Sequence, residues 1–368
     1  MAKSIKRFVF IFMLFMLSSC AKESPTMVKY ELIYDFDVET IAYPEKVSTF
    51  SVEPIRFSMA SLEETILQTA ITTTEITALG PVYRTELGEY LMIYDDGEAF
   101  GTKTGLNGGF SYQMELSEES FPYHRLSVMD VTKQLSDLSF YQEFDFQVDD
   151  YQQPMDLSFA TKEQASAAIE AVFQKISEEE ITLREEVTYT LTTEKMREQI
   201  ASSTVQEEFV RLPTEKDEAY IFHLQQVIAG MPLVTQEWEN RTAEATHPRL
   251  IPKVVVTYTQ AGAILIEARY LMQERSELTK VSILSPEIIL ASFEKQLLLA
   301  DRHMESLDLE YLPVFDKEGI KLIPVWRLTT WQTTRFKSAD GQSFEYPKYQ
   351  IFMFNAETGK IIEGAIEE

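Results

Sequence analysis

Few side chains in this sequence have the type and spacing that metal binding or nucleophilic catalysis requires. No two of the four histidines (His124, His223, His247 and His303) lie at the spacing of a HExxH, HxH or Cys/His zinc motif. His223 lies in an alternating, strand-like segment, so we expect it on a solvated or hydrogen-bonded sheet face. Nucleophile elbows, phosphate-binding loops and dinucleotide-binding glycine motifs are also absent from the sequence. The sequence therefore predicts no metal, no cofactor and no enzymatic activity.

Two other groups of residues could still converge into a site. Acidic clusters at 145–150 and 178–180 contain the carboxylates that glycoside cleavage uses, although a chain this acidic also forms such clusters as solvated faces. Trp326 and Trp331, with Arg327 nearby, could line a groove for a peptide or a glycan. The alternative is that at least one of these tryptophans belongs to the core.

Cys20 is the only cysteine, so it has no partner for a disulfide within the chain. Basic residues at 3–7 are followed by an apolar run over 8–17, which is too short to cross a bilayer as a permanent helix and fits a cleaved export signal. The segment Leu17-Ser18-Ser19-Cys20 resembles a bacterial lipobox, in which the cysteine is acylated and becomes the new N-terminus. We therefore expect lipid on Cys20 that anchors the chain to the extracytoplasmic face of the bacterial cell membrane.

The charge of the chain limits the partners that it can have. Its 33 Lys and Arg against 59 Asp and Glu give a net charge of −26. No stretch supplies clustered basic residues with interleaved aromatic ones, which excludes nucleic acid as a partner. Anionic lipid headgroups should repel the body of the protein, so membrane contact is expected at the anchor alone. Hydrophobic residues make up 45% of the chain, enough to bury real cores.

Mixed strand and helix periodicities predict an α+β fold of antiparallel sheets, each packed by a capped helix. Ser61 is the expected N-cap of a first helix, and Thr161 with Gln164 forms a capping box before a second. Ser285 precedes a proline that would open a third. Strands are expected over 51–57, 90–94, 181–189, 220–227, 254–258, 264–270, 309–314, 321–328 and 349–354.

The order of a capped helix followed by antiparallel strands occurs twice, which suggests a diverged duplication. The expected organisation has five parts, namely a signal peptide (1–19), a tether (20–46), an N-terminal α+β region (47–155) and two similar modules (156–275 and 276–368).

Three short segments carry a resemblance to a known family. They are YIFHLQQVIAGMPL at 220–233, LIPVW at 322–326 and NAETGKII at 355–362. These segments are similar to the PepSY-like modules of envelope proteins in Gram-positive bacteria, including the YycH and YycI proteins, in which a strand with Phe and Gln leads to a Gly-x-Pro turn. YycH and YycI are held by a transmembrane helix, whereas this chain has a lipobox. The resemblance implies a non-enzymatic α+β protein that binds or regulates another envelope protein.

A second function stays open at this point. The chain could be an envelope hydrolase, or a lipoprotein that binds glycans or peptides, whose carboxylates or tryptophans come together only in the fold. A deep pocket with two carboxylates about 5–9 Å apart would favour this alternative.

The expected anchor can be tested on protein extracted from membranes. Intact-mass spectrometry should show a mature chain that begins at a diacylated or triacylated Cys20, because lipobox processing removes 1–19. The Cys20→Ala variant should lack this modification. An unmodified chain that still begins at Met1 would contradict the prediction.

Overall fold

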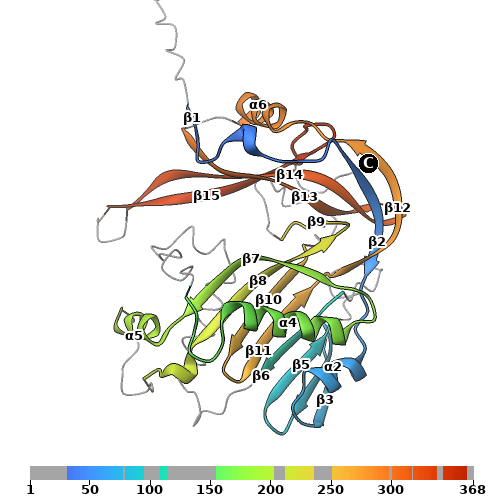
Figure 1. Cartoon of the computed structure of the whole chain (residues 1–368), viewed down its shortest axis with the longest axis vertical. Helices are drawn as coiled ribbons and strands as arrows, with labels where there is room; N and C mark the ends of the chain where they lie inside the picture. The colour runs from blue at the N-terminus through green and yellow to red at the C-terminus, as the bar shows by residue number, and fades with distance from the viewer. Residues whose placement is uncertain are drawn as a thin grey trace, which may run out of the picture.

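The computed structural model describes residues 31–77, 79–94, 108–114, 155–202, 212–235, 251–297, 301–316, 318–337 and 343–362. In this part of the chain, a six-stranded sheet lies above a nine-stranded sheet, as oriented in Figure 1. Neighbouring strands pair antiparallel in both sheets, except that β1 runs parallel to β13. The expectation of antiparallel sheets accompanied by a few helices is therefore confirmed.

The nine-stranded sheet draws its strands from two parts of the chain. In the order in which they lie side by side, its strands are β3 (Ile71–Thr77), β4 (Gly80–Thr85), β5 (Glu89–Ile93), β6 (Phe110–Met114), β11 (Gly262–Arg269), β10 (Lys253–Thr259), β8 (Ala219–Ile228) and β7 (Thr182–Leu191). The short strand β9 (Met231–Pro232) also pairs with β8. The strand expected at 90–94 is β5, which pairs with β4 on one side and with β6 on the other.

Two helices cover one face of this sheet, α2 (Met59–Thr65) and α4 (Lys162–Ile176) (Figure 1). The predicted capping box is present at α4, where the Thr161 hydroxyl accepts from the amide N–H of Gln164 and the Gln164 side chain accepts from the amide of Thr161. Phe173 of α4 is fully buried against Phe110 of β6. The N-cap of α2 is Ser58 rather than the expected Ser61, because the Ser58 hydroxyl accepts from the Ser61 amide.

The six-stranded sheet is packed by α6 (Pro286–Leu297), which begins one residue after Ser285 as predicted. Its strands are β1 (Leu32–Tyr34), β13 (Arg302–Asp316), β14 (Gly319–Lys337), β2 (Lys46–Pro54) and β12 (Met272–Ser282) in that order, with β15 (Ser343–Asn355) paired to β14. Phe293 of α6 packs on Phe352 of β15 with a ring-centroid distance of 5.1 Å. The remaining short elements are α5 (Thr193–Ser202) and the 3₁₀ turns Val38–Thr40 and Glu215–Asp217.

Strands from the region 47–155 are divided between the two sheets. β2 lies in the six-stranded sheet, whereas β3 to β6 complete the nine-stranded sheet beside strands of the region 156–275. β12 crosses residue 275, the expected boundary between the two modules. The expected boundaries therefore do not separate the sheets, although a helix followed by antiparallel strands occurs in each.

A buried glutamine joins the two sheets where the chain passes from β11 to β12. The Gln226 side chain of β8 donates from Nε2 to the carbonyl of Met272 at 2.6 Å and accepts from the Met272 amide at 2.9 Å. Both residues are buried, so the glutamine amide satisfies main-chain groups that water does not reach. A second link lies nearby, where the amide of Val234 donates to the carbonyl of Tyr311 at 2.9 Å.

Replacing Gln226 with leucine should lower the free energy of unfolding by about 2–4 kcal/mol, because the substitution leaves a buried amide and a buried carbonyl of Met272 without partners. Urea denaturation monitored by circular dichroism measures this change. Gln273→Leu is the control, since the half-buried Gln273 bonds to a side chain (Glu53) and not to the main chain. Equal losses in both variants would contradict the proposed role of Gln226.

Candidate functional site

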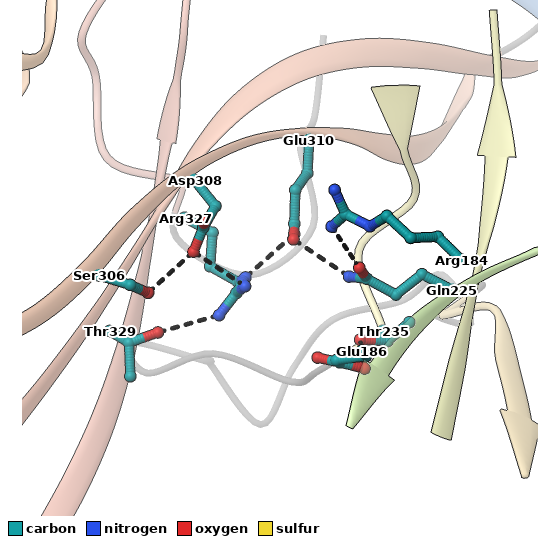
Figure 2. A network of polar contacts seen from close by, with 9 residues as sticks. All are labelled: Arg184, Glu186, Gln225, Thr235, Ser306, Asp308, Glu310, Arg327 and Thr329. Atoms are coloured by element: carbon teal, nitrogen blue, oxygen red, sulfur yellow. Dashed lines mark hydrogen bonds and ion pairs between the residues drawn. The ribbon is translucent and has the colours of Figure 1, made fainter. Parts of the chain in front are cut away.

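Charged and polar side chains from both sheets meet in one network, which we call the inter-sheet network (Figure 2). β13 and β14 contribute five of its members, and the other four come from β7, β8 and the segment that follows β9. Its members are Arg184, Glu186, Gln225, Thr235, Ser306, Asp308, Glu310, Arg327 and Thr329.

Arg327 of β14 is the main donor of the network. Its Nε donates to Glu310 Oε2 and its Nη2 to Asp308 Oδ2, both at 3.1 Å, and its Nη1 donates to the hydroxyl of Thr329 at 2.9 Å. The register places Arg327 directly opposite Asp308 on β13, and Glu310 lies two residues further along the same strand. Two carboxylates on one face of a strand thus share one guanidinium.

Glu310 connects the two sheets. Its side chain has no exposed surface, and its Oε1 accepts from Gln225 Nε2 of β8 at 3.1 Å. The carbonyl oxygen of the same Gln225 side chain accepts from Arg184 Nη2 of β7 at 2.6 Å. The side-chain amide of Gln225 therefore bridges Glu310 and the guanidinium of Arg184, which lies on the lower sheet.

Burial and charge act in opposite directions on these groups. Burial raises the pKa of Glu310 above its ordinary value, and this outweighs the opposing effects of Arg327 and the Gln225 hydrogen bond. For Arg327, burial lowers the pKa, but the negative charges of Glu310 and Asp308 outweigh it and hold the pKa above its ordinary value. The guanidinium of Arg327 therefore stays charged, and its positive charge stabilises the ionised form of Glu310.

This arrangement favours a structural role over acid–base catalysis. Both carboxylates already bind a cation, and Glu310 is closed to solvent, so no reactant reaches it in this structure. An ion pair of this kind costs free energy to desolvate and fixes how its two partners are placed. We therefore assign the inter-sheet network to holding the two sheets in one orientation.

The structure does not bring Trp326, Arg327 and Trp331 together in a groove. Trp326 is fully buried, donates from Nε1 to the carbonyl of Leu284 at 3.0 Å and packs on Tyr43, on the face of the sheet that carries α6. Arg327 follows it in the strand and points to the opposite face, toward the lower sheet. The predicted groove is therefore wrong for this pair, because adjacent strand residues lie on opposite faces. The alternative, a tryptophan in the core, is correct for Trp326.

Trp331 belongs to a separate surface cluster with His303 and Asp35. The Trp331 and His303 rings are stacked, with centroids 3.6 Å apart and an interplanar angle of 11°. Asp35 accepts from Trp331 Nε1 at 3.2 Å and lies 3.4 Å from His303 Nδ1. The cluster ties the segment after β1 to β13 and β14, so these polar atoms already have partners within the chain.

Other residues singled out in the sequence have mixed outcomes. His223 is buried with its ring at right angles to that of Tyr189, so of the two expected environments, a solvated or a hydrogen-bonded sheet face, the solvated one is wrong. The acidic residues at 178–180 are exposed, as expected for a solvated face. Cys20, His124, His247 and the acidic cluster at 145–150 lie outside the described residues.

The described residues also line an open groove with a volume of about 1620 Å³ near the start of α5. Its charged members are Asp156, Glu194, Arg197, Glu198, Glu215, Lys216 and Glu218. Glu218 accepts from the amide and the hydroxyl of Thr193, and Arg197 donates to the carbonyl of Pro213, so these two side chains hold α5 in place. The groove contains none of the residues predicted to form a site.

Two further observations apply to the described ranges only. None of their helices has both the length and the apolar character needed to cross a membrane. Among the same residues, no three histidine, cysteine or acidic side chains gather closely enough to hold a metal ion.

Comparison with known proteins gives a fold but no family. No family model matches the chain, and no curated protein matches it. The structure is similar to the crystal structure of an uncharacterized protein from Eubacterium rectale, with a TM-score of 0.56 and 16% sequence identity over 92% of this chain and 90% of that chain. At this identity the likeness shows the fold alone.

Sequence reasoning missed the centre of the network. Glu310 is the only charged residue of the segment 309–314, which is predicted as a strand, and a single acid in such an apolar segment indicates a buried, paired carboxylate. That signal identifies Glu310, but its partner Gln225 lies on another sheet and has no local signature.

Above the folded-state pKa of Glu310, Arg327→Met should lower the free energy of unfolding by about 3–5 kcal/mol, because it leaves the ionised carboxylate buried without its cation. A carboxyl whose pKa is raised in the folded state binds protons more tightly there than when unfolded. The loss should therefore be smallest below the ordinary pKa of 4.5 and should grow as the pH rises through the folded-state pKa. Urea denaturation across this pH range measures it.

The double variant Arg327→Met with Glu310→Gln provides the control. With no carboxyl at 310, its loss of stability relative to Glu310→Gln should no longer vary with pH in this way. A pH-independent loss in Arg327→Met would contradict burial of an ionised Glu310.

Proposed function

We propose that this chain is a lipid-anchored, non-enzymatic envelope protein that binds another envelope protein and regulates it. The observation that carries the proposal is the exposure of strands at sheet edges. In β12, all side chains from Glu274 to Lys280 are exposed, and in β3 all those from Thr72 to Ile76 are exposed. An edge strand presents main-chain donors and acceptors that a second protein can pair with.

The buried carboxylates support the same proposal, because they already have hydrogen-bond partners within the chain. Asp308 and Glu310 share Arg327, and a further buried carboxylate, Glu89, accepts from the amides of Gln68 and Thr69 and from the hydroxyl of Tyr112. These groups stabilise the fold through internal hydrogen bonds, and the exposed sheet edges offer surfaces for recognition.

The resemblance to PepSY-like modules, including those of YycH and YycI, agrees with a binding role. The segment at 220–233 forms β8, a turn and β9, and Ala229 and Gly230 both adopt positive φ in that turn. The segment at 355–362 begins with a turn in which Asn355 Oδ1 accepts from the amides of Glu357 and Thr358. These motifs determine turns between strands, and they therefore support a rigid scaffold for recognition.

In the proposed arrangement, lipid on Cys20 holds the chain at the extracytoplasmic face of the membrane. The described chain starts at Glu31, immediately before β1, at the end of the long axis opposite to β3 (Figure 1). The tether would therefore leave from the six-stranded sheet, and the nine-stranded sheet would project away from the bilayer.

Site-specific photo-crosslinking in intact cells tests this function. A photoreactive residue at exposed positions such as 74 of β3 and 278 of β12 should give a protein adduct of defined mass. The same adduct should be much weaker in the Cys20→Ala variant, because that variant is not held beside envelope partners. A buried position, 293 of α6, is the negative control. If no exposed position gives an adduct above this control, the proposed function is wrong.

A further inference from the structure

We propose that the free edge of β3 receives an extended segment of the partner protein, which pairs with it as an additional strand of the nine-stranded sheet. This inference rests on the proposed function and specifies where, and by what chemistry, the partner binds.

β3 is an edge strand with no cover over its side chains. Among the described strands it pairs only with β4, from Thr77 opposite Gly80 to Ile71 opposite Thr85. The five side chains from Thr72 to Ile76 are exposed, and Ile76 is 78% exposed, the highest value among the large apolar side chains that are exposed in the described residues. Thr and Ile favour the extended conformation, so β3 is already shaped for pairing.

The other long edges of the two sheets carry features that oppose pairing, and β3 lacks most of them. β12 has two register shifts and four charged residues between 274 and 280. β15 contains Pro347, which has no amide proton, and β7 has a register shift between Glu185 and Val187. The register shift of β3 lies at its start, between Ile71 and Thr73, and the rest of the strand contains one charge, Glu75. Charges, prolines and bulges are the usual means of blocking an edge, so β3 is the least protected of the four.

The two faces of β3 define the chemistry of the incoming strand. Thr74 is opposite Tyr83, which packs against the core under α2 and α4, so Ile76, two residues further on, lies on that same face. Glu75 is opposite Val82 and lies on the other face. A segment that places an apolar side chain beside Ile76 and a lysine or arginine beside Glu75 therefore complements both faces.

The charge and the position of β3 favour another protein over a second copy or a lipid surface. With a net charge of −26, two copies of this chain repel each other, whereas a basic segment is attracted. β3 also lies at the end of the molecule opposite to β1, where the chain enters (Figure 1). A bilayer at the tether would be remote from this edge.

A synthetic peptide tests the edge directly. The probe is a capped ten-residue peptide of alternating valine and lysine, and its control contains two central prolines in place of valines. Hydrogen exchange with mass spectrometry should show slower exchange in 71–77 with the probe and no change with the control. Fluorescence anisotropy of the labelled probe gives the affinity at physiological salt.

Matched variants separate edge pairing from general attraction to an acidic protein. Ile76→Lys should weaken probe binding by about tenfold, because it removes the apolar contact and adds a like charge. Leu278→Lys, the same change on the β12 edge, should leave binding unchanged. Glu75→Lys should weaken binding about two- to fivefold and should improve binding of a valine–glutamate peptide, whereas Glu357→Lys in a distant turn should do neither.

Each result decides the inference. Protection of 71–77 that Ile76→Lys abolishes supports it. No protection at millimolar peptide, or equal effects of Ile76→Lys and Leu278→Lys, overturns it. A dimer of the free protein that Ile76→Lys dissolves in sedimentation would show that β3 pairs with a second copy instead. If cell crosslinks form at 278 but not at 74, the proposed function stands and this inference fails.

Discussion

A carboxylate removed from water must be held by donors that stay in place, and in this chain that requirement couples two sheets. Glu310 has no exposed surface, and its two oxygens bind Arg327 on the neighbouring strand and Gln225 on the other sheet. A shift of one sheet against the other would leave a buried charge with one partner, which costs several kcal/mol. The orientation of the sheets, and of every edge that they expose, therefore depends on this contact.

Two adjacent glutamines each form hydrogen bonds that join the two sheets. Gln225 and Gln226 point to opposite faces of β8, as successive strand residues must. Gln225 reaches the carboxylate of Glu310, while Gln226 pairs with the main chain of Met272 at the start of β12. The amide side chain suits both tasks because it donates and accepts at once.

Local features of the fold follow from the sequence, and long-range ones do not. The capping box at Thr161 and the start of α6 are encoded within a few residues, and the alternation of β8 is visible in the chain itself. The exchange of strands between regions is different, because Val52 of β2 pairs with Ile320 of β14 and Ala268 of β11 with Phe110 of β6. The sequence of one strand carries no local signal that identifies the strand with which it pairs.

The candidate site shows the same division. Arg327 directly follows Trp326 in the sequence, and the alternation of a strand already places these two residues on opposite faces. Its true partners are visible only once β13 is in register with β14 and β8 lies beneath them. Glu310, the single acid of the apolar segment 309–314, is the signal that sequence reasoning could have used.

Within the described residues, the chain crosses between the sheets twice, side by side and in opposite directions. One crossing follows β2 into Ile55, and the other leads from Leu271 into β12, with a hydrogen bond of 2.8 Å from the Ile55 amide to the Leu271 carbonyl. A pull on the chain ahead of Glu31 would first peel β1, which is held to β13 over three residues. It would then load the β2–β12 pair along its length, where many hydrogen bonds share the force. The double crossing thus makes the molecule a stiff mechanical link between its N-terminal end and the nine-stranded sheet.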